Sequence, residues 1–293
     1  MTEAVLLMAY GTPSSPDEIE AYYTDIRRGR PPTPEQLADL VRRYEAIGGI
    51  SPLGARTEAQ RAGLQAALDE RAPGRFEVVL GFKHAAPRIE DAVAAIDADR
   101  IVALVLAPHF SELSVGEYLE RAAGAAGSTS FAAVESWATE PAYVDFLTGA
   151  VREQLDAMPD GTKVLFTAHS LPQRAGPRYA AELRATAEAV AERAGLLPWA
   201  GWAVGWQSAG RTPEPWLGPD VREVIADLAG TGRATGLLVC PCGFVADHLE
   251  VLYDLDIEAA AAAAEEGLPF ARTRVLNDDP TVLGALADRV LQA

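Results

Sequence analysis

The sequence contains few of the residues that stabilise secreted or membrane-spanning proteins. Its two cysteines, Cys240 and Cys242, are separated by one residue, which excludes the disulfide framework of a small secreted domain. No apolar run reaches the roughly 20 residues that a membrane-spanning helix needs, and no basic segment precedes the first apolar run. We therefore expect a cytoplasmic protein with reduced thiols, no export signal and no membrane span.

Positive charge is also scarce. The chain has 25 Lys and Arg against 42 Asp and Glu, which gives a formal net charge of -17 at pH 7. Because this field repels a phosphate backbone, we exclude nucleic acid as a partner. The same field enriches cations near the surface, whereas an anionic ligand would need a basic pocket of its own.

The pattern of apolar residues predicts an α/β protein. With 293 residues, 49% hydrophobic and 23% charged, the chain is long enough for two globular domains. Short apolar runs bounded by turn residues alternate with longer amphipathic segments, which is typical of βαβ units and parallel sheets. The predicted strands are 4–9, 77–81, 101–107, 163–168, 201–206 and 236–240. The predicted crossover helices are 35–46, 58–70, 143–157, 180–194 and 221–228.

A polar stretch near the midpoint predicts a domain boundary. Residues 158–162 contain Pro and Gly, as linkers between domains often do. We therefore expect an N-terminal Rossmann-like domain, residues 1–157, and a C-terminal one, residues 158–293. The expected fold class is α/β, with two doubly wound parallel sheets facing a cleft, and the last helix, 280–292, is expected to pack on the first domain.

The two halves of the sequence resemble each other. Residues 5–13 and 164–172 share a strand that ends in Ala, a polar side chain next and a Pro three positions later, and four of the nine positions are identical. Two explanations fit: an internal duplication, or the frequent reuse of Gly and Pro in short turns. A duplication would bring Tyr10 and His169 to one cleft, because ligands bind beyond the carboxyl ends of parallel strands.

His169 directly follows a predicted strand. An imidazole there can accept a proton near neutral pH or bind a metal, or it can be a structural histidine with both nitrogens hydrogen-bonded. The segment after the last predicted strand favours the first interpretation. Glu250 lies there near a helix start beside apolar residues, where partial burial would bring its pKa toward neutrality. A histidine and a carboxylate from opposite sides of a pocket could move protons and hold a metal.

Glu250 also begins a row of three carboxylates. Glu250, Asp254 and Glu258 are spaced i, i+4 and i+8, so one continuous helix would align them at intervals of roughly 6 Å. Such a row is ordinarily a solvated face. Hard oxygen ligands in a line also suit a hydrated divalent cation that moves inward.

Arginines concentrate in one region of this acidic chain. Five lie within residues 27–43, namely Arg27, Arg28, Arg30, Arg42 and Arg43. Guanidinium groups bind carboxylates through two parallel hydrogen bonds, so this cluster indicates a ligand with several carboxylates. Salt bridges to acidic neighbours such as Asp39 are the alternative, which we favour for Arg28 and Arg42.

The other histidines and the cysteines carry weaker signals. His84, His109 and His248 lie beside predicted strand ends or early in a helix, where we expect hydrogen-bonded structural roles. Two thiolates alone fill neither a tetrahedral metal site nor a four-cysteine cluster. We therefore expect Cys240 and Cys242 to be buried and inert.

Six ordered motifs cover nearly the whole chain. They are Leu7-Met-Ala-Tyr-Gly-Thr-Pro13, Ala107-Pro-His-Phe110, Thr167-Ala-His-Ser-Leu-Pro172, Gly205-Trp-Gln-Ser208, Pro213-Glu-Pro-Trp-Leu-Gly-Pro219 and Gly243-Phe-Val-Ala-Asp-His-Leu-Glu250. In this order they resemble the ferrochelatase family, most closely the branch that inserts iron into coproporphyrin III in monoderm bacteria. The segment 81–87, Gly-Phe-Lys-His-Ala-Ala-Pro, also resembles that branch.

The resemblance implies roles for individual residues. His169 and Glu250 correspond to the catalytic pair on which Fe2+ insertion depends, and they would bind the metal. Asp254 and Glu258 match the acidic line proposed as a metal relay, so they are further expected metal ligands. Tyr10 would bind the opposite side of the porphyrin and approach the iron of the product. The other residues expected to contact the macrocycle and its propionates are Arg27, Arg43, Tyr44, Ser51 and Tyr118.

The resemblance also implies partners. Porphyrin and Fe2+ would be the substrates, no cofactor would be permanently bound, and no iron-sulfur cluster is expected because the added cysteines of some relatives are missing. We expect a monomer that passes its product to a haem-accepting downstream enzyme. The Gly-Asp-x-Tyr element of the family reads Gly176-Pro-Arg-Tyr179 here, so a hydrogen-bonding Asp is missing and the local loop is expected to repack.

Three alternative functions fit parts of the pattern. A protoporphyrin IX ferrochelatase would use the same catalytic pair. A non-catalytic haem or porphyrin carrier would need Tyr10 and the arginines but not Glu250. A chelatase that inserts cobalt or nickel into a sirohydrochlorin-type ring would be expected to use paired histidines, and the single His169 argues against it.

Overall fold

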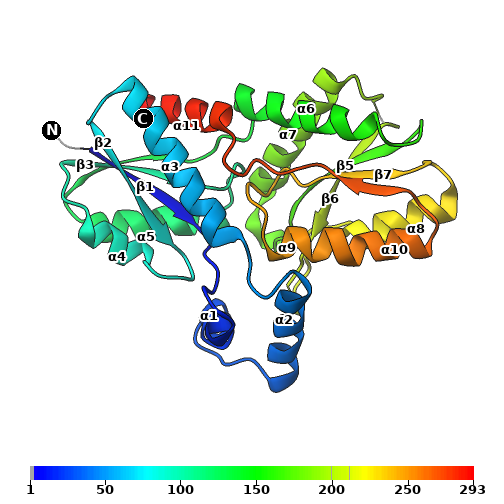
Figure 1. Ribbon diagram of the computed structural model, residues 1–293, viewed down its shortest axis with the longest axis horizontal. Coiled ribbons are helices and arrows are strands. Elements are labelled where there is room, and N and C mark those ends of the chain that lie inside the picture. The colour runs from blue at the N-terminus through cyan, green and yellow to red at the C-terminus, as the bar shows by residue number, and fades with distance from the viewer. Residues whose placement is uncertain (1–2, 199, 211) are drawn as a thin grey trace.

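The structure, a computed structural model, describes residues 3–198, 200–210 and 212–293 and arranges them around two parallel sheets (Figure 1). The first sheet has the order β2-β1-β3-β4, and its strands are β1 (Glu3–Ala9), β2 (Phe76–Phe82), β3 (Arg100–Val105) and β4 (Ser130–Val134). The second has the order β6-β5-β7-β8, and its strands are β5 (Lys163–His169), β6 (Trp202–Gln207), β7 (Leu237–Cys240) and β8 (Phe270–Arg272). The predicted α/β class with two parallel sheets is confirmed.

The two sheets have the same topology. In each, the first strand of the half lies between the second and the third, and the fourth strand forms an edge. Tyr10 after β1 and His169 at the end of β5 therefore occupy equivalent places in the two sheets. A duplication would produce this matching order, which is also a common order of doubly wound sheets.

Helices cover both faces of each sheet. Their bounds are α1 (Ile19–Ile26), α2 (Pro34–Ala46), α3 (Leu53–Arg71), α4 (Ile89–Ala95), α5 (Glu117–Ala126), α6 (Pro141–Leu155), α7 (Pro177–Ala194), α8 (Val221–Thr231), α9 (Leu249–Leu252), α10 (Ala260–Glu265) and α11 (Pro280–Gln292). Figure 1 shows α3 and α11 above the first sheet, α4 and α5 below it, and α1 and α2 projecting from the underside. No helix within the described residues is long and apolar enough to cross a membrane.

The central strands are buried on both faces, as the continuous apolar runs predict. Every residue of β1 is buried. Val5 and Leu7 pack toward α3 and α11, while Leu6 and Met8 pack toward α4 and α5. The edge strands β4 and β8 are not predicted from the sequence, because β4 is mostly half-exposed and β8 has only three residues, so neither carries a long apolar run.

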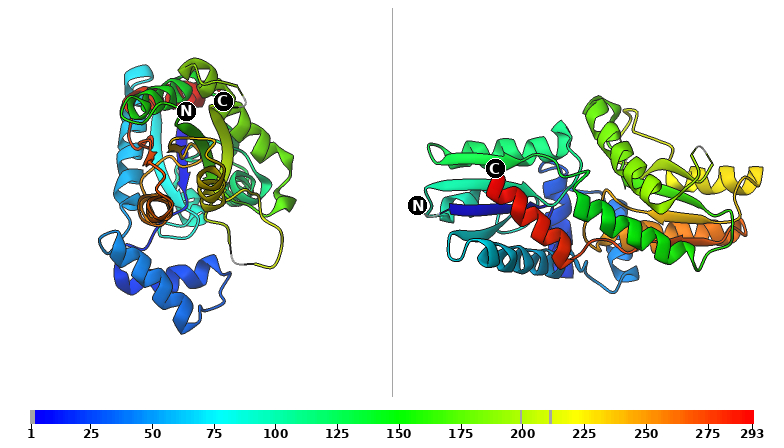
Figure 2. Two further views of the ribbon diagram at one scale, coloured as in Figure 1. Left: turned by 90° about the vertical axis from the view of Figure 1, so that its right-hand side faces the viewer. Right: turned by 90° about the horizontal axis from the view of Figure 1, so that it is seen from above.

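The last helix returns to the first sheet. Arg71 of α3 donates from Nε to Asp288 of α11 at 2.5 Å, and α11 also contacts α6. Figure 2 shows α11 beside α3, with the two chain termini at the same end of the molecule. The chain therefore crosses between the two sheets twice, which ties them together.

A close approach at Gly243 joins the two segments that carry the candidate site. The Gly243 amide donates to the Thr167 carbonyl at 2.9 Å, and a Cβ at Gly243 would lie 2.3 Å from the Cβ and 2.6 Å from the Cα of Ala168. The loop after β7 thus rests directly on the end of β5. Only glycine allows this contact.

Replacing Gly243 by Ala should push that loop away from β5. We expect Gly243→Ala to lower the free energy of unfolding by about 1–3 kcal/mol, the usual cost of overpacking. Thermal and urea denaturation would measure it. The matched control is Gly149→Ala on α6, where a Cβ meets open space and helix propensity should instead add up to about 1 kcal/mol. Equal stabilities for the two variants would contradict the close approach.

Candidate functional site

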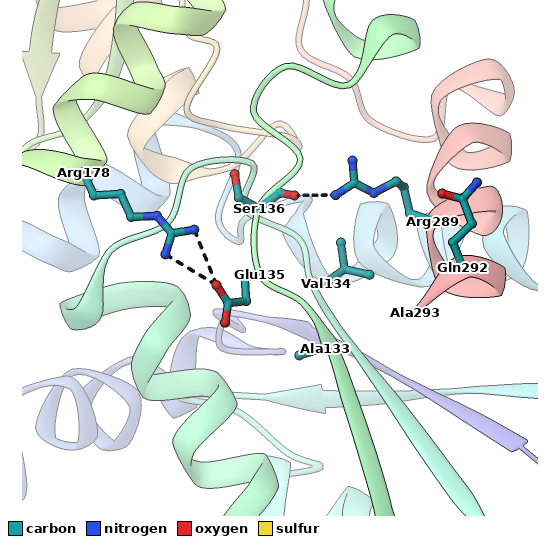
Figure 3. A pocket seen from close by; sticks show the side chains of 8 residues that line it. All are labelled: Ala133, Val134, Glu135, Ser136, Arg178, Arg289, Gln292 and Ala293. Atoms are coloured by element: carbon teal, nitrogen blue, oxygen red, sulfur yellow. Dashed lines mark hydrogen bonds and ion pairs between the residues drawn. The ribbon is translucent and has the colours of Figure 1, made fainter.

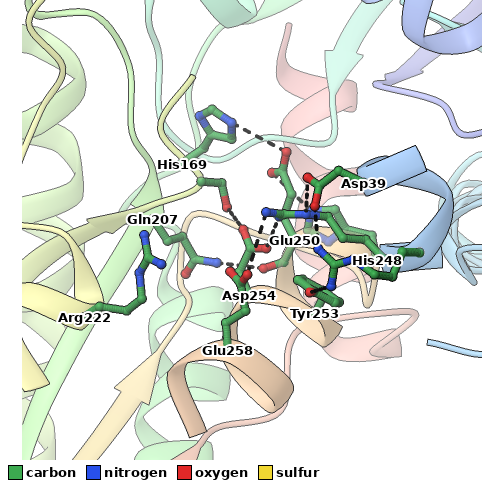
Figure 4. Close-up of polar contacts among 12 residues, drawn as sticks. Asp39, His169, Gln207, Arg222, His248, Glu250, Tyr253, Asp254 and Glu258 are labelled. Carbon is green, nitrogen blue, oxygen red and sulfur yellow. Dashed lines mark hydrogen bonds and ion pairs between the residues drawn. The ribbon is translucent and has the colours of Figure 1, made fainter. Parts of the chain in front are cut away.

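His169 and Glu250 reach one point from separate elements of the second sheet. His169 is the last residue of β5 and follows five buried residues, so its side chain is the first to leave the core. Glu250 lies in the first turn of α9, and its Oε1 is 3.6 Å from the Nε2 of His169 (Figure 4). The two side chains are 34% and 36% exposed, so a substrate can reach both.

Each member of this pair changes the charge state of the other. Desolvation in the cleft opposes ionisation of both groups, but the negative charge of Glu250 outweighs it and raises the pKa of His169. The positive charge of His169, with help from His248, likewise overcomes desolvation and lowers the pKa of Glu250. Each group therefore favours the charged form of the other. A divalent cation bound at this place would displace the proton from His169.

His248 is a second histidine beside the carboxylate. Its Nδ1 is 2.9 Å from the Ala246 carbonyl, as expected for a structural histidine, and its Nε2 is 3.7 Å from Oε2 of Glu250. Glu250 is therefore flanked by one imidazole on each oxygen. This second contact is not predicted from the sequence, although His248 stands only two residues before Glu250.

Gln207 connects the two segments of the pair, and sequence reasoning missed it. Its side-chain Nε2 donates to the backbone carbonyl of Glu250 at 2.9 Å, and its Oε1 accepts from Thr167 at 3.0 Å. Its backbone carbonyl accepts from the amide of Ser170 at 2.7 Å. Gln207 is buried at the carboxyl end of β6, as His169 is at the end of β5. That strand-end position is the signal that could have identified it.

The segment that lacks the Asp of the family pattern still contacts His169. Pro177 begins α7, where a missing amide proton costs nothing, and Gly176 before it has a φ of 82°. The Tyr179 hydroxyl donates to the His169 carbonyl at 3.1 Å. The Tyr179 ring packs against Trp206 with 5.5 Å between centroids. An aromatic residue of α7 therefore anchors the backbone of His169.

The acidic row is not the regular helix predicted from its spacing. α9 ends at Leu252, and a π-helical turn, Asp254–Ala259, follows before α10. The Tyr253 carbonyl accepts from the amide of Glu258 at 2.9 Å, a bond across five residues that widens the turn. The expectation of one α-helical face is thus corrected, because the backbone is wound more loosely where the acidic residues lie.

Arg43 of α2 forms ion pairs with the second and third carboxylates of the row, Asp254 and Glu258. Its Nη1 is 3.3 Å from Asp254 and its Nη2 is 3.7 Å from Glu258, while Ser208 donates to the other oxygen of Asp254. The Asp254 side chain is only 14% exposed, so it is not part of a solvated face. Desolvation and the charge of Glu250 raise the pKa of Asp254 to about 6. Asp254 therefore titrates close to neutral pH.

Two residues of the acidic row, Asp254 and Glu258, line a pocket of about 440 Å³ between α2 and the second sheet. Arg42 and Arg43 of α2 contribute one side, and Ser208, Asp254 and Glu258 contribute the other. Arg42 forms the predicted ion pair with Asp39. His169 and Glu250 are not part of its lining, so this pocket borders the pair on the side of the outer acidic residues.

Tyr10 directly follows the last residue of β1 and is 41% exposed. Although one side of the Tyr10 ring is exposed, desolvation and the charge of Glu250 raise the pKa of its phenol. Tyr44 and Tyr118 are buried, and desolvation raises the pKa of both. The charge of Glu250 also acts on Tyr44, which brings these phenols and the carboxylate to one space.

Two other expected substrate-binding residues contact their own segments. The Arg27 guanidinium lies 5.5 Å from the centroid of the Tyr23 ring, and its Nε donates to the carbonyl of Arg30 at 3.1 Å. Ser51 is buried and accepts from the amide of Leu53 at 3.2 Å, at the start of α3. The charge of Glu250 thus acts on Tyr10 and Tyr44, whereas the contacts of Arg27 and Ser51 described here lie within their own segments.

A second pocket, of about 370 Å³, lies where β4, α7 and α11 meet (Figure 3). Arg178 and Arg289 point into it from opposite sides. Arg178 is 3.4 Å from Glu135, and Arg289 donates to the carbonyl of Ser136 at 3.1 Å. The cations of this pocket are balanced by neighbouring acceptors, and its lining includes no residue of the pair or the acidic row.

The pair offers too few donors for a structural metal. Across residues 3–198, 200–210 and 212–293, no group of three or more His, Cys, Asp or Glu side chains is arranged to hold a metal ion. His169 and Glu250 supply two donors, so a metal held there would complete its shell from water or from another ligand.

Comparison with known sequences decides the family. The sequence profile of ferrochelatase matches residues 2–293. The chain belongs to the ferrochelatase family. The coproporphyrin III ferrochelatase of Geobacillus thermodenitrificans strain NG80-2 is 45% identical to it, over 99% of this chain and 96% of that protein. The coproporphyrin III ferrochelatase of Bacillus subtilis strain 168 is 44% identical, over 98% and 96%, and a ferrochelatase of Herpetosiphon aurantiacus is 43% identical, over 97% and 96%.

Solved structures share the fold of this ferrochelatase-family chain at low identity. CbiX, described as the terminal enzyme of sirohaem biosynthesis in denitrifying bacteria, has a TM-score of 0.57 at 16% identity, over 100% of this chain and 99% of that one. The sirohydrochlorin chelatase SirB from Bacillus subtilis subspecies spizizenii, solved with cobalt, has a TM-score of 0.56 at 13% identity, over 100% and 95%. The two-sheet arrangement is therefore that of the chelatases.

Replacing Glu250 by Gln should lower the pKa of His169. Without the carboxylate charge, desolvation dominates, and we expect the midpoint of an NMR titration of the imidazole to fall below its value in the native chain. In the native chain the ion pair stabilises the fold above the ordinary Glu pKa near 4.5 and below the ordinary His value near 6.5. Its contribution is lost as the pH rises through the raised pKa of His169.

The control for this titration is Glu192→Gln, an exposed position on α7. It should leave the His169 midpoint where it is in the native chain. A midpoint that Glu250→Gln does not move would show that the two groups are not electrostatically coupled.

Proposed function

We propose that this chain inserts Fe2+ into coproporphyrin III and so produces coprohaem in haem biosynthesis. The observation that carries the proposal is the His169–Glu250 pair, which opens into a cleft that Tyr10 enters from the other sheet. It combines a proton acceptor, a metal ligand and an aromatic wall for a flat ring. The relatives named coproporphyrin III ferrochelatases match nearly the whole chain and support this substrate.

Metal insertion requires the ring to lose two protons and to expose its nitrogens. In a free-base porphyrin the pyrrole nitrogens point into the ring plane, so a flat ring offers no lone pair to a metal above it. Contacts to the propionates and the macrocycle can supply the binding energy that holds the ring in a distorted shape. The residues proposed for these contacts are Arg27, Arg43, Tyr44, Ser51 and Tyr118, with Tyr10 on the face of the ring opposite His169.

His169 acts as the proton acceptor in this proposal. The positive charge of arriving Fe2+ favours neutral imidazole, so the proton of the ion pair leaves first. The neutral Nε2 then takes a pyrrole proton and passes it to Glu250, 3.6 Å away. Glu250 releases this proton to water before the step is repeated for the second pyrrole proton, and His248 stabilises Glu250 while it is charged.

The acidic row supplies the path for the metal. Asp254 and Glu258 would receive hydrated Fe2+ from the cleft, and Glu250 would help to remove its water. Because Arg43 pairs with Asp254 and Glu258, a divalent cation must compete with Arg43 for these two carboxylates. An arginine displaced in this way is free to bind a propionate, so arrival of the metal and binding of the ring would support each other.

We further propose that the chain works as a monomer in the cytoplasm, without a resident cofactor, and passes its product to a haem-accepting enzyme. Cys240 and Cys242 are free and buried, which is compatible with a reducing compartment. Size-exclusion chromatography with light scattering would test the monomer.

His169→Ala should abolish metal insertion while the porphyrin still binds. We expect initial rates under anaerobic Fe2+ to fall by roughly 100-fold or more, because the proton acceptor is gone. Fluorescence quenching would show that coproporphyrin III binds within a few-fold of the native affinity. Turnover at the native rate would refute the role of His169.

Glu250→Gln separates an enzyme from a carrier. An enzyme should lose most of its rate, because the carboxylate no longer accepts the proton or binds Fe2+. A carrier should bind haem and porphyrin as before, and native binding combined with no iron insertion by the unsubstituted chain would contradict the proposed reaction.

Initial rates with two porphyrins would test the substrate. We expect a higher kcat/KM with coproporphyrin III than with protoporphyrin IX, since four propionates offer more contacts to the arginines than two. A preference for protoporphyrin IX would overturn the choice of substrate and leave the reaction type in place.

A further inference from the structure

We propose that Asp25 is a positioning residue for the porphyrin face opposite His169: it holds His84 against Tyr10 and fixes the end of α1 that carries Arg27. This inference rests on the proposed function, because it concerns how the ring is held. Neither Asp25 nor His84 is among the residues that the sequence motifs place in contact with the porphyrin.

Asp25 links two segments that are far apart in the sequence. Its Oδ2 lies 2.6 Å from Nδ1 of His84 and accepts from Nη1 of Arg88 at 2.9 Å. The same Arg88 nitrogen donates to the carbonyl of Lys83 at 2.8 Å. The Asp25 carboxylate of α1 thereby contacts the residues that follow β2 at two points, and Arg88 is itself bonded to that segment.

His84 in turn supports Tyr10 in two ways. Its backbone amide donates to the carbonyl of Tyr10 at 2.9 Å, and its ring packs on the phenol with 4.6 Å between centroids at an angle of 56°. The His84 side chain is only 14% exposed, while Tyr10 is 41% exposed. The phenol is therefore backed by the imidazole on one side and open to the cleft on the other.

The charge of Asp25 gives this link its strength. The hydrogen bonds from Arg88 and His84 lower the pKa of Asp25 to about 2, so the carboxylate is ionised at any working pH. Burial lowers the pKa of His84, so the neutral ring donates its Nδ1 proton to Asp25. Hydrogen bonds to a charged acceptor are stronger than those between neutral groups. An amide at position 25 would keep the shape of the carboxylate and lose this charge.

Asp25 also fixes the end of α1. Its carbonyl accepts from the amide of Arg28 at 2.8 Å, and Arg27, the residue after α1 that is expected to bind a propionate, follows two positions after Asp25. A shift of Asp25 would therefore move Arg27 and release His84 together. One carboxylate sets the position of a ring-facing phenol and of a propionate-facing guanidinium.

The test compares Asp25→Asn with Glu20→Gln, an exposed position on the same helix. We expect Asp25→Asn to raise KM for coproporphyrin III about tenfold, while kcat changes less than about threefold because His169 and Glu250 are untouched. The control should change neither value. An Asp25→Asn enzyme with the KM of the control would overturn the proposal, and so would a loss of kcat at unchanged KM.

A spectroscopic experiment tests the link from Asp25 through His84 to Tyr10 without measuring turnover. Ferric coprohaem is added to each protein, and its visible absorption bands report the ligand on the iron. Asp25→Asn and His84→Ala should both shift these bands toward those of Tyr10→Phe, and the double variant should add little to the larger single shift. Bands identical to those of Glu20→Gln would refute the link. If the unsubstituted chain inserts no iron, the proposed function fails, but this experiment still decides the role of Asp25.

Discussion

The contact between the His169 imidazole and the Glu250 carboxylate is the interaction on which the rest of the site depends. In the cleft neither charge is stable alone, because desolvation opposes both, so each group is ionised through the other. The contact exists only because the loop after β7 lies on the end of β5 at Gly243, and because Gln207 bonds to both segments. The packing of the backbone thus places the two charges next to each other. In the proposed reaction, their position determines where a proton and a metal can be exchanged.

The two sheets have the same topology, but they place chemically different side chains on the two walls of the cleft. Both halves present a side chain at the carboxyl end of their first strand, a phenol at Tyr10 and an imidazole at His169. Each is supported by its own half: His84 and Asp25 back the phenol, whereas Tyr179 and Gln207 anchor the segment of the imidazole. A flat ring between them meets an aromatic wall on one face and a proton acceptor on the other.

Much of this was predictable from the sequence, for physical reasons. The strands with continuous apolar runs have predicted ends within two residues of the observed ends. The motifs that contain His169 and Glu250 indicate one site. The edge strands β4 and β8 were not predictable, because a short or half-exposed strand has no continuous apolar run. The π-helical turn at Asp254 was missed because side-chain spacing does not reveal a backbone bond across five residues. Gln207 and Asp25 escaped notice because their partners lie in other segments and only tertiary packing brings them together.

The most direct measurement is a crystal structure of this chain with metal-free coproporphyrin III. We expect the ring to lie in the cleft between Tyr10 and His169, distorted from planarity, with a pyrrole nitrogen facing Nε2 of the histidine and the carboxylate of Glu250 behind it. A planar ring bound elsewhere, or one that leaves the imidazole and the phenol on the same face, would contradict the mechanism.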